Sequence, residues 1–165
     1  MSTYKDLQAY FENFARNHSA IVHTDEESHF FNSDINEILS GIREKVNFPC
    51  VLMADYDYSF VDNDSDNYHK RRSIALVFLD HCSDSDDFES ISDIYSEMEQ
   101  IADDWINRIF SDKTERRHPF LKDFEIDEIN AVQFSTIDNN FGIWLPLTAT
   151  SLHDISIDTK KWSDL

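Results

Sequence analysis

The stretch HTDEESH, residues 23–29, holds the side chains in this chain that are best suited to bind a metal ion. Its candidate ligands are His23, Asp25, Glu26 and His29. Zinc requires three or four protein ligands, and two histidines six residues apart do not lie on one face of a helix. Ser, Asp and Glu just before a helix are also typical of a solvated connector. We therefore predict no metal site here, and we expect His23 to be a hydrogen-bonded structural residue if it lies in a short strand.

A second acidic stretch, DNDSDNYHKRRS, places Asp62, Asp64 and Asp66 at the first three ligand positions of a calcium-binding loop. Position six is Asn67 rather than Gly, and position twelve is Ser73 rather than the bidentate Glu. Both residues that define such a loop are therefore missing. The pattern favours a solvated hairpin turn, with a weak incidental cation site as the alternative.

The sequence motifs of the common enzyme classes are absent: it contains no GxSxG, HExxH or GxxxxGKS. Pairs of carboxylates carry little information in a chain with 33 acidic residues, and two glycines leave no glycine-rich phosphate loop. Cys50 and Cys82 form no CxxC motif, so we expect both to behave as small buried hydrophobic residues. We predict a protein that is not an enzyme and that uses no cofactor.

The net charge limits the partners of this chain. Thirty-three acidic residues against 14 Lys and Arg give a formal charge of −19, which repels both nucleic-acid phosphates and anionic lipids. The basic clusters at 70–72 and 116–118 are short, and we interpret them as salt-bridging loops. The first ten residues lack the basic and apolar regions of a signal peptide, and no apolar run reaches about 20 residues, so we expect neither a signal peptide nor a membrane span. We expect a protein of the reducing cytoplasm, unless an assembly carries it elsewhere.

The hydrophobic pattern predicts one α+β domain over residues 1–165. It would comprise an N-terminal helical part (1–47), a sheet with a long helix (48–150) and a C-terminal tail (151–165). The sheet is expected to be mostly antiparallel and four-stranded, with the long helix on one face. Apolar residues at three- and four-residue spacing predict helices over 3–18, 33–46 and 87–111, and alternation predicts strands over 49–60, 73–81, 129–138 and 141–152.

Several details of these elements can be predicted. Asp86 lies three residues before Glu89, as in a capping box at the start of the long helix, and Gly142 is expected to serve a tight turn. The residues expected on one face of the first strand are Cys50, Leu52, Ala54, Tyr56, Tyr58 and Phe60. The residues expected on the apolar stripe of the long helix are Phe88, Ile91, Ile94, Tyr95, Met98, Ile101, Ala102, Trp105, Ile109 and Phe110.

Three residues are candidates for a subunit interface. Pro146 cannot donate a hydrogen bond to a neighbouring strand, so the last strand is expected to be an edge strand or to be bulged there. Trp144 lies on the same face of that strand. Trp162, in the tail, has no evident local partner.

Three stretches, in this order, resemble a known family: FPCVLMADYDYSF, SIALVFLDHCSDSDDFESISDIYSEMEQIADDWINRIF and FSTIDNNFGIWLPLTAT. The pattern is similar to the tail terminator or tail completion proteins of tailed bacteriophages, which close the tail tube or join it to the neck. The matching features are Pro49 at the start of a hairpin, the helix end from Ile101 to Phe110, and Asp138 with Gly142. The resemblance covers about residues 48–150; residues 1–47 and the loop 61–72 lie outside it.

The resemblance implies a non-enzymatic virion protein that forms a ring, commonly a homohexamer, and contacts the tail tube and the neck or connector proteins. Such a protein would reside in the virion, and in the host cytoplasm during assembly. An acidic lumen would let DNA pass without binding it, although an acidic surface also simply keeps a protein soluble. The alternative is an acidic inhibitor or immunity protein that mimics phosphate and blocks a basic nuclease or toxin. A cytoplasmic domain with another binding role is a third possibility.

Overall fold

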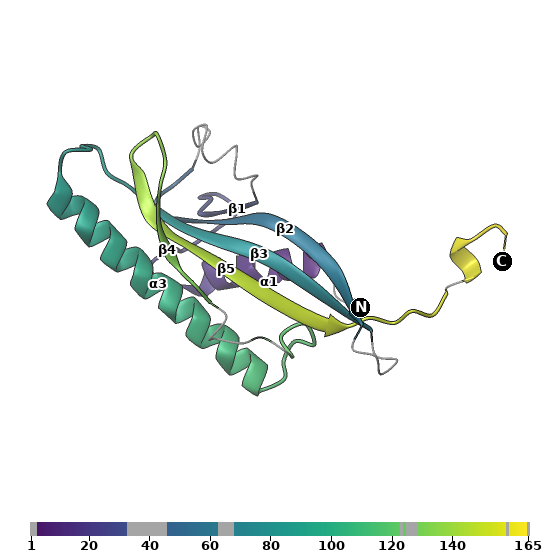
Figure 1. Cartoon of the computed structure of the whole chain (residues 1–165). Helices are drawn as coiled ribbons and strands as arrows, with labels where there is room; N and C mark the ends of the chain where they lie inside the picture. Colours follow the sequence, from purple (N-terminus) through teal and green to yellow (C-terminus); the bar gives the residue numbers. More distant parts are fainter. Residues whose placement is uncertain are drawn as a thin grey trace.

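The computed structural model describes residues 3–32, 46–62, 68–122, 124, 129–157 and 159–164. Its elements confirm an α+β domain (Figure 1). The predicted helix over 33–46 lies almost entirely outside the described residues, as do Asp64 and Asp66 of the candidate calcium loop. The described elements are α1 (Tyr4–Asn17), β1 (Phe30–Asn32), β2 (Cys50–Asp62), β3 (Tyr68–His81), α3 (Phe88–Thr114), β4 (Val132–Ser135), β5 (Asn140–Leu152) and the short 3₁₀ helix η1 (Thr159–Lys161).

The sheet has five strands in the order β1-β2-β3-β5-β4, so the predicted number of four is wrong, whereas the mostly antiparallel pairing is confirmed. The additional strand, β1, pairs in parallel with β2. The backbone N–H of Val51 donates to the carbonyl of His29 at 2.8 Å and joins the two. A strand of three residues is too short to produce a recognisable alternation. The N-terminal part is consequently not only helical.

The strands β2 and β3 form the predicted antiparallel hairpin, but both are longer than expected. Asp62 at the end of β2 pairs with Tyr68 at the start of β3. Most of the described part of the polar segment 61–72 therefore lies in strands, not in a loop. The basic cluster 70–72 belongs to β3.

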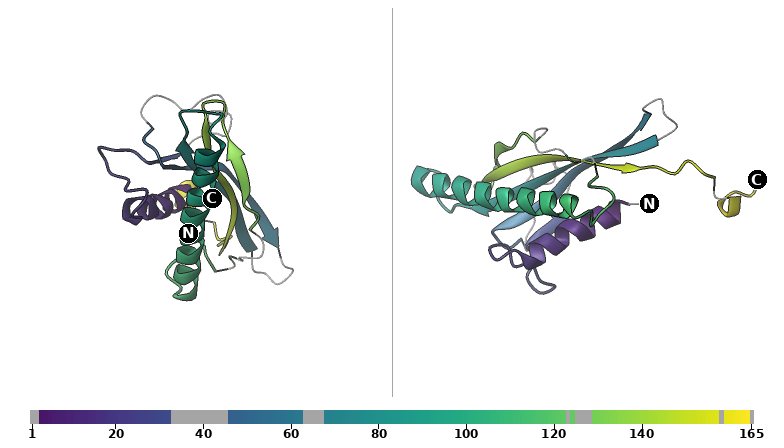
Figure 2. Two further views of the ribbon diagram at one scale, coloured as in Figure 1. Left: turned by 90° about the vertical axis from the view of Figure 1, so that its left-hand side faces the viewer. Right: turned by 90° about the horizontal axis from the view of Figure 1, so that it is seen from below.

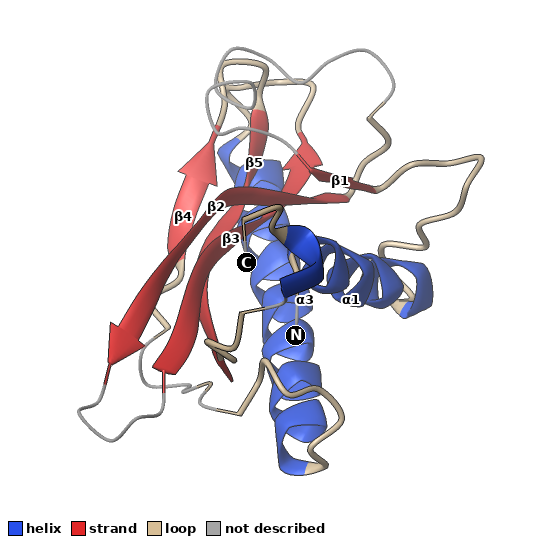
Figure 3. Cartoon of the chain, turned by 90° about the vertical axis from the view of Figure 1, so that its right-hand side faces the viewer, coloured by secondary structure: helices blue, strands red, loops and turns tan. Residues whose placement is uncertain are grey.

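Both helices pack on the same face of the sheet and cross one another there (Figures 2 and 3). The N-cap residue of α1 is Thr3, which forms a capping box with Asp6. The helix α3 spans 27 residues, or about 40 Å at 1.5 Å per residue. Its N-cap is Asp87, which accepts from the backbone N–H of Ser90 at 3.1 Å, so the capping box predicted from Asp86 and Glu89 is wrong.

The centre of the core is Trp105 on α3, which is 1% exposed. Its indole packs against Phe11 and Phe14 of α1 and against Phe78 of β3, with ring centroids 5.2 to 6.2 Å apart. The stripe predicted for this helix is therefore largely confirmed. Its two ends were assigned wrongly, because Phe88 is 77% exposed and Phe110 is 48% exposed.

A bulge in β2 changes which side chains share a face. The pairing with β3 shifts register between Ala54 and Asp57, and Asp55 has a φ of 49°. Before the bulge, Cys50, Leu52 and Ala54 share the face of the sheet that points away from the helices, as predicted. Tyr56 instead joins the helix side, where its ring packs against Tyr4 with centroids 4.8 Å apart. The prediction that all alternate residues from 50 to 60 share one face is wrong beyond the bulge, because an inserted residue reverses the alternation.

Gly142 serves a close approach between strands and not the tight turn that the sequence suggested. It pairs with Leu79 of β3, and a Cβ at this position would lie 1.8 Å from the carbonyl oxygen of Phe78. In the turn between β4 and β5, Asn139 adopts the positive φ, at 57°. Asn is tolerated in this left-handed region because its short polar side chain bonds locally.

The first part of the strand β5 lies inside the sheet, between two other strands, and its second part lies at the edge of the sheet. Four residues of β4 pair with Phe141–Trp144. Beyond Trp144, the described residues on that side contribute one isolated bridge, between Leu121 and Thr150. The edge-strand prediction drawn from Pro146 is accordingly wrong for the first part of β5 and right for the second. The strand also continues to Leu152, two residues into the predicted tail.

Candidate functional site

The two histidines of the HTDEESH stretch are held by backbone hydrogen bonds. The ring Nδ1 of His23 accepts from the backbone N–H of His29 at 3.0 Å and of Phe30 at 3.3 Å. The ring of His29 bonds to the carbonyl of Pro49 at 2.8 Å, and since a carbonyl only accepts, His29 carries its proton on Nδ1. These bonds place β1 beside β2. His23 is thus a hydrogen-bonded anchor between segments, although it does not lie in the short strand for which this role was expected.

The acidic side chains of this stretch form the solvated connector that the sequence predicts. Asp25 pairs with Arg16 of α1 at 2.6 Å, and the Thr24 hydroxyl accepts from the backbone N–H groups of Glu26 and Glu27. Among the residues that the structure describes, no three His, Cys, Asp or Glu side chains come together as metal ligands. Cys50 and Cys82 are free and buried, as predicted, and burial raises the pKa of the Cys50 thiol.

The C-terminal arm, residues 153–164 without the undescribed 158, leaves the domain after β5 and extends away from it (Figure 1). His153 still donates its backbone N–H to the carbonyl of Tyr68, at 2.8 Å. Beyond it, Ile155, Ile157 and Trp162 are 62%, 63% and 58% exposed. Such exposure of three large apolar side chains on one short segment is typical of a surface that another molecule covers.

Of the three predicted interface residues, two lie together and one lies apart. Trp144 and Pro146 are half-buried neighbours on the face of β5 that points away from the helices, and the Trp144 ring packs on Phe134 of β4 at 5.6 Å between centroids. Trp162 follows η1 directly in the arm, which extends away from β5 (Figure 1). The tertiary structure therefore does not bring Trp162 to the other two within one chain. Ile155 and Ile157 were missed, although their two-residue spacing in the sequence could have identified them.

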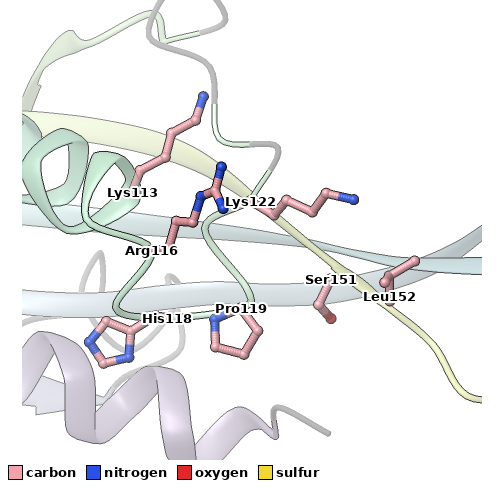
Figure 4. A pocket seen from close by; sticks show the side chains of 7 residues that line it. All are labelled: Lys113, Arg116, His118, Pro119, Lys122, Ser151 and Leu152. Atoms are coloured by element: carbon pink, nitrogen blue, oxygen red, sulfur yellow. The ribbon is translucent and has the colours of Figure 1, made fainter.

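A basic pocket lies where α3 ends and β5 ends (Figure 4). Its volume is about 670 Å³, and its lining residues are Lys113, Arg116, His118, Pro119, Lys122, Ser151 and Leu152. They come from the last turn of α3, the loop after it, and the end of β5. This concentration of cationic side chains is unexpected in a chain of net charge −19.

The cationic side chains around the basic pocket differ in whether they already form hydrogen bonds or ion pairs. Arg117, beside it, pairs with Asp112 at 3.2 Å and with Glu115, as predicted for a salt-bridging loop. Lys113 donates to the carbonyl of Phe124. The side chains of Arg116 and Lys122 are exposed and form no hydrogen bond or ion pair among the described residues. These two side chains are available to an anionic group from outside the chain.

At its other end, α3 carries an acidic tip, defined here as residues 84–89. Asp84, Asp86, Asp87 and Glu89 are all exposed, as is Phe88 between them. Ten acidic residues and no Lys or Arg occur between residues 80 and 107. The charge of the molecule is therefore polarised along its longest helix.

No family model matches this sequence, and the comparison with curated proteins finds no significant match. Among the described helices, none is both long and apolar enough to cross a membrane.

Proposed function

We propose that this protein is a structural subunit of a tailed phage, which forms a ring at the junction of neck and tail, completes the tail and joins it to the head. The observation that carries the proposal is the C-terminal arm. It displays Ile155, Ile157 and Trp162 on a segment that extends away from its own domain. An arm of this kind buries its apolar side chains only against another molecule.

The arm's backbone also suits strand addition. Ile155 and Ile157 are two residues apart, so in an extended segment they point to the same side. An extended peptide of this pattern adds to a sheet margin through main-chain hydrogen bonds, and its alternate side chains enter pockets. The second part of β5, past Trp144, offers such a margin beside the half-buried Pro146. Each subunit therefore has a segment that can add to a sheet, which is the arm, and a sheet edge that can receive such a segment, which is the second part of β5.

A donor and a receiver at different places on one chain give a heterologous contact. Repetition of such a contact closes into a ring when the rotation between subunits closes, and a hexamer is the ring size that the family resemblance implies. The proposal includes no catalytic step and no cofactor. The exposed side of α3 carries six of the ten acidic residues between 80 and 107, and these six would repel DNA phosphates in a lumen.

The test is electron microscopy of the purified chain, alone and co-expressed with the proteins encoded by its neighbouring genes. Rings of full-length protein are expected. A triple variant of the arm, Ile155→Ser with Ile157→Ser and Trp162→Ser, should remain folded by circular dichroism and lose the rings. The matched control is Ile137→Ser, which changes a side chain that is 75% exposed in the turn before β5. Rings that survive loss of all three arm side chains would remove the observation on which the proposal rests.

The second candidate function, an acidic inhibitor that mimics phosphate, is favoured by one observation. The acidic residues between 80 and 107 include an exposed row on α3, among them Asp93, Glu97 and Asp103. Rows of carboxylates on a helix suit the basic cleft of a nuclease. Nanomolar inhibition of a basic nuclease, lost in Asp93→Lys with Glu97→Lys, would favour this function over the ring. A gene that lies outside any phage or prophage cluster would point the same way.

A further inference from the structure

We infer that the basic pocket is a docking site for the acidic tip of a second copy of this chain, so that subunits join head to tail along α3. This inference rests on the proposed ring of identical subunits and names one of the contacts that would build it. The two surfaces are defined above: the acidic tip is residues 84–89, and the basic pocket is the cavity around Arg116 and Lys122.

The charges of the two surfaces are complementary. The acidic tip presents four exposed carboxylates, from Asp84, Asp86, Asp87 and Glu89. The basic pocket presents Lys113, Arg116 and Lys122 together with His118. Complementary charge steers two surfaces together and fixes their register, whereas like charges across a contact exclude the wrong register. In a chain of net charge −19, the basic pocket is a cationic cavity that suits such a partner.

The apolar groups are complementary as well. Phe88, the first residue of α3, is 77% exposed in the middle of the acidic tip. Pro119 and Leu152 contribute apolar surface to the lining of the basic pocket, and Leu152 is 56% exposed. A cavity of about 670 Å³ is large enough to hold a phenyl ring. An aromatic anchor in a pocket, ringed by polar contacts, is the usual arrangement at the centre of a protein interface.

The two surfaces cannot meet within one molecule. They lie at opposite ends of α3, about 40 Å apart along a straight helix. The N-terminal end of this helix and the end of β5 that leads to the arm are also at opposite ends of the molecule in perpendicular views (Figures 1 and 2). The contact is therefore between different patches on two copies, which is the heterologous type that builds rings.

Charge reversal tests the contact directly. The tip variant is Asp84→Lys with Asp86→Lys and Glu89→Lys, which leaves the N-cap Asp87 in place and changes the charge of the four acidic residues of the tip from −4 to +2. The pocket variant is Arg116→Glu with Lys122→Glu. Each variant alone has like charges on both surfaces, and its self-association should weaken more than about tenfold. Sedimentation at millimolar protein and low salt measures this, because salt screens such contacts.

A mixture of the two variants supplies the decisive result. The reversed tip of one then meets the reversed pocket of the other, and the native tip meets the native pocket, so association should return and produce alternating rings. One chain that carries all of these substitutions should also associate. The matched control, Asp93→Lys with Glu97→Lys and Asp103→Lys, changes the charge by the same amount on the exposed middle of α3 and should leave association unchanged.

The outcomes separate this contact from the proposed function. If neither variant weakens self-association, or if the mixture does not restore it, the head-to-tail contact is overturned. The arm would then be the remaining proposed contact of the ring. Wild-type protein that stays monomeric under these conditions overturns the contact as well. If rings also fail to form with the neighbouring gene products, the proposed function is overturned in addition.

Discussion

The phenol of Tyr10 on α1 donates a hydrogen bond of 3.1 Å to Oδ2 of Asp112 on α3, 102 residues away in the sequence. Asp112 is 2% exposed, and Arg108 and Arg117 contact its other oxygen, Oδ1, at 3.3 and 3.2 Å. Burial and the adjacent carboxylate hold the pKa of Tyr10 above its ordinary range, so the phenol keeps its proton and donates. This bond ties the first helix to the end of the long one, beside the basic pocket.

Loss of this bond should destabilise the domain. Tyr10→Phe is expected to lower the free energy of unfolding by about 1.5–3 kcal/mol, since the acceptor is charged and buried. Asp112→Ala should cost about 3 kcal/mol, the low end for one member of a buried ionic group, because Arg108 and Arg117 are half exposed and remain solvated. Urea unfolding of both variants and of the double variant gives the coupling energy. Additive losses would show that the two side chains act independently.

Removal of the central indole should be more costly. Trp105→Ala is expected to lower the free energy of unfolding by about 3–5 kcal/mol, because the ring is buried among Phe11, Phe14 and Phe78. The matched control on the same helix is Phe88→Ala, which should change stability by about 0.5 kcal/mol or less, since its ring is exposed. Denaturant unfolding at equal protein concentration compares the two. Equal effects would contradict the burial on which the prediction rests.

Gly142→Ala should force β3 and β5 apart. A Cβ there would lie 1.8 Å from the carbonyl oxygen of Phe78, which is backbone and cannot rotate away. Overpacking of this kind costs about 1–3 kcal/mol, and we expect the upper part of that range. The control, Thr148→Ala on the same strand, should cost less than about 1 kcal/mol. A fully stable Gly142→Ala protein would mean that the strands separate here without loss.

The anchor histidine should make stability fall at acidic pH. Burial, aided by the charge of Arg16, holds the pKa of His23 below its ordinary value near 6.5. Protonation of Nδ1 would also break its two backbone hydrogen bonds. As pH falls below about 6.5, the unfolded state takes up a proton that the folded state still resists, so stability decreases until the folded His23 also titrates. His23→Gln, whose side chain accepts but does not titrate there, should reduce this decrease; an unchanged pH profile would contradict it.

The sequence alone determined the elements that depend on local pattern. Spacings of three and four residues predicted α1 and α3, because a helix repeats its faces within a few residues of chain. Alternation identified the hairpin of β2 and β3 and the strand β5, whose side chains Ile143, Leu145, Leu147 and Ala149 are buried. The helical spacing also placed Trp105 on the apolar stripe of α3, and its ring is buried in the core.

Only the tertiary structure decided the features that depend on which segments meet. The strand β1 exists because the His29 carbonyl accepts from Val51, and the reversal of faces after Ala54 follows from pairing with β3; neither leaves a local pattern. Gly142 was mistaken for a turn residue because its neighbour, the Phe78 carbonyl, is 64 positions earlier in the chain. The basic pocket likewise joins the end of α3 to Ser151 and Leu152 of β5. Contacts between distant residues are fixed by the packing of the sheet, and the sequence near each residue carries no record of them.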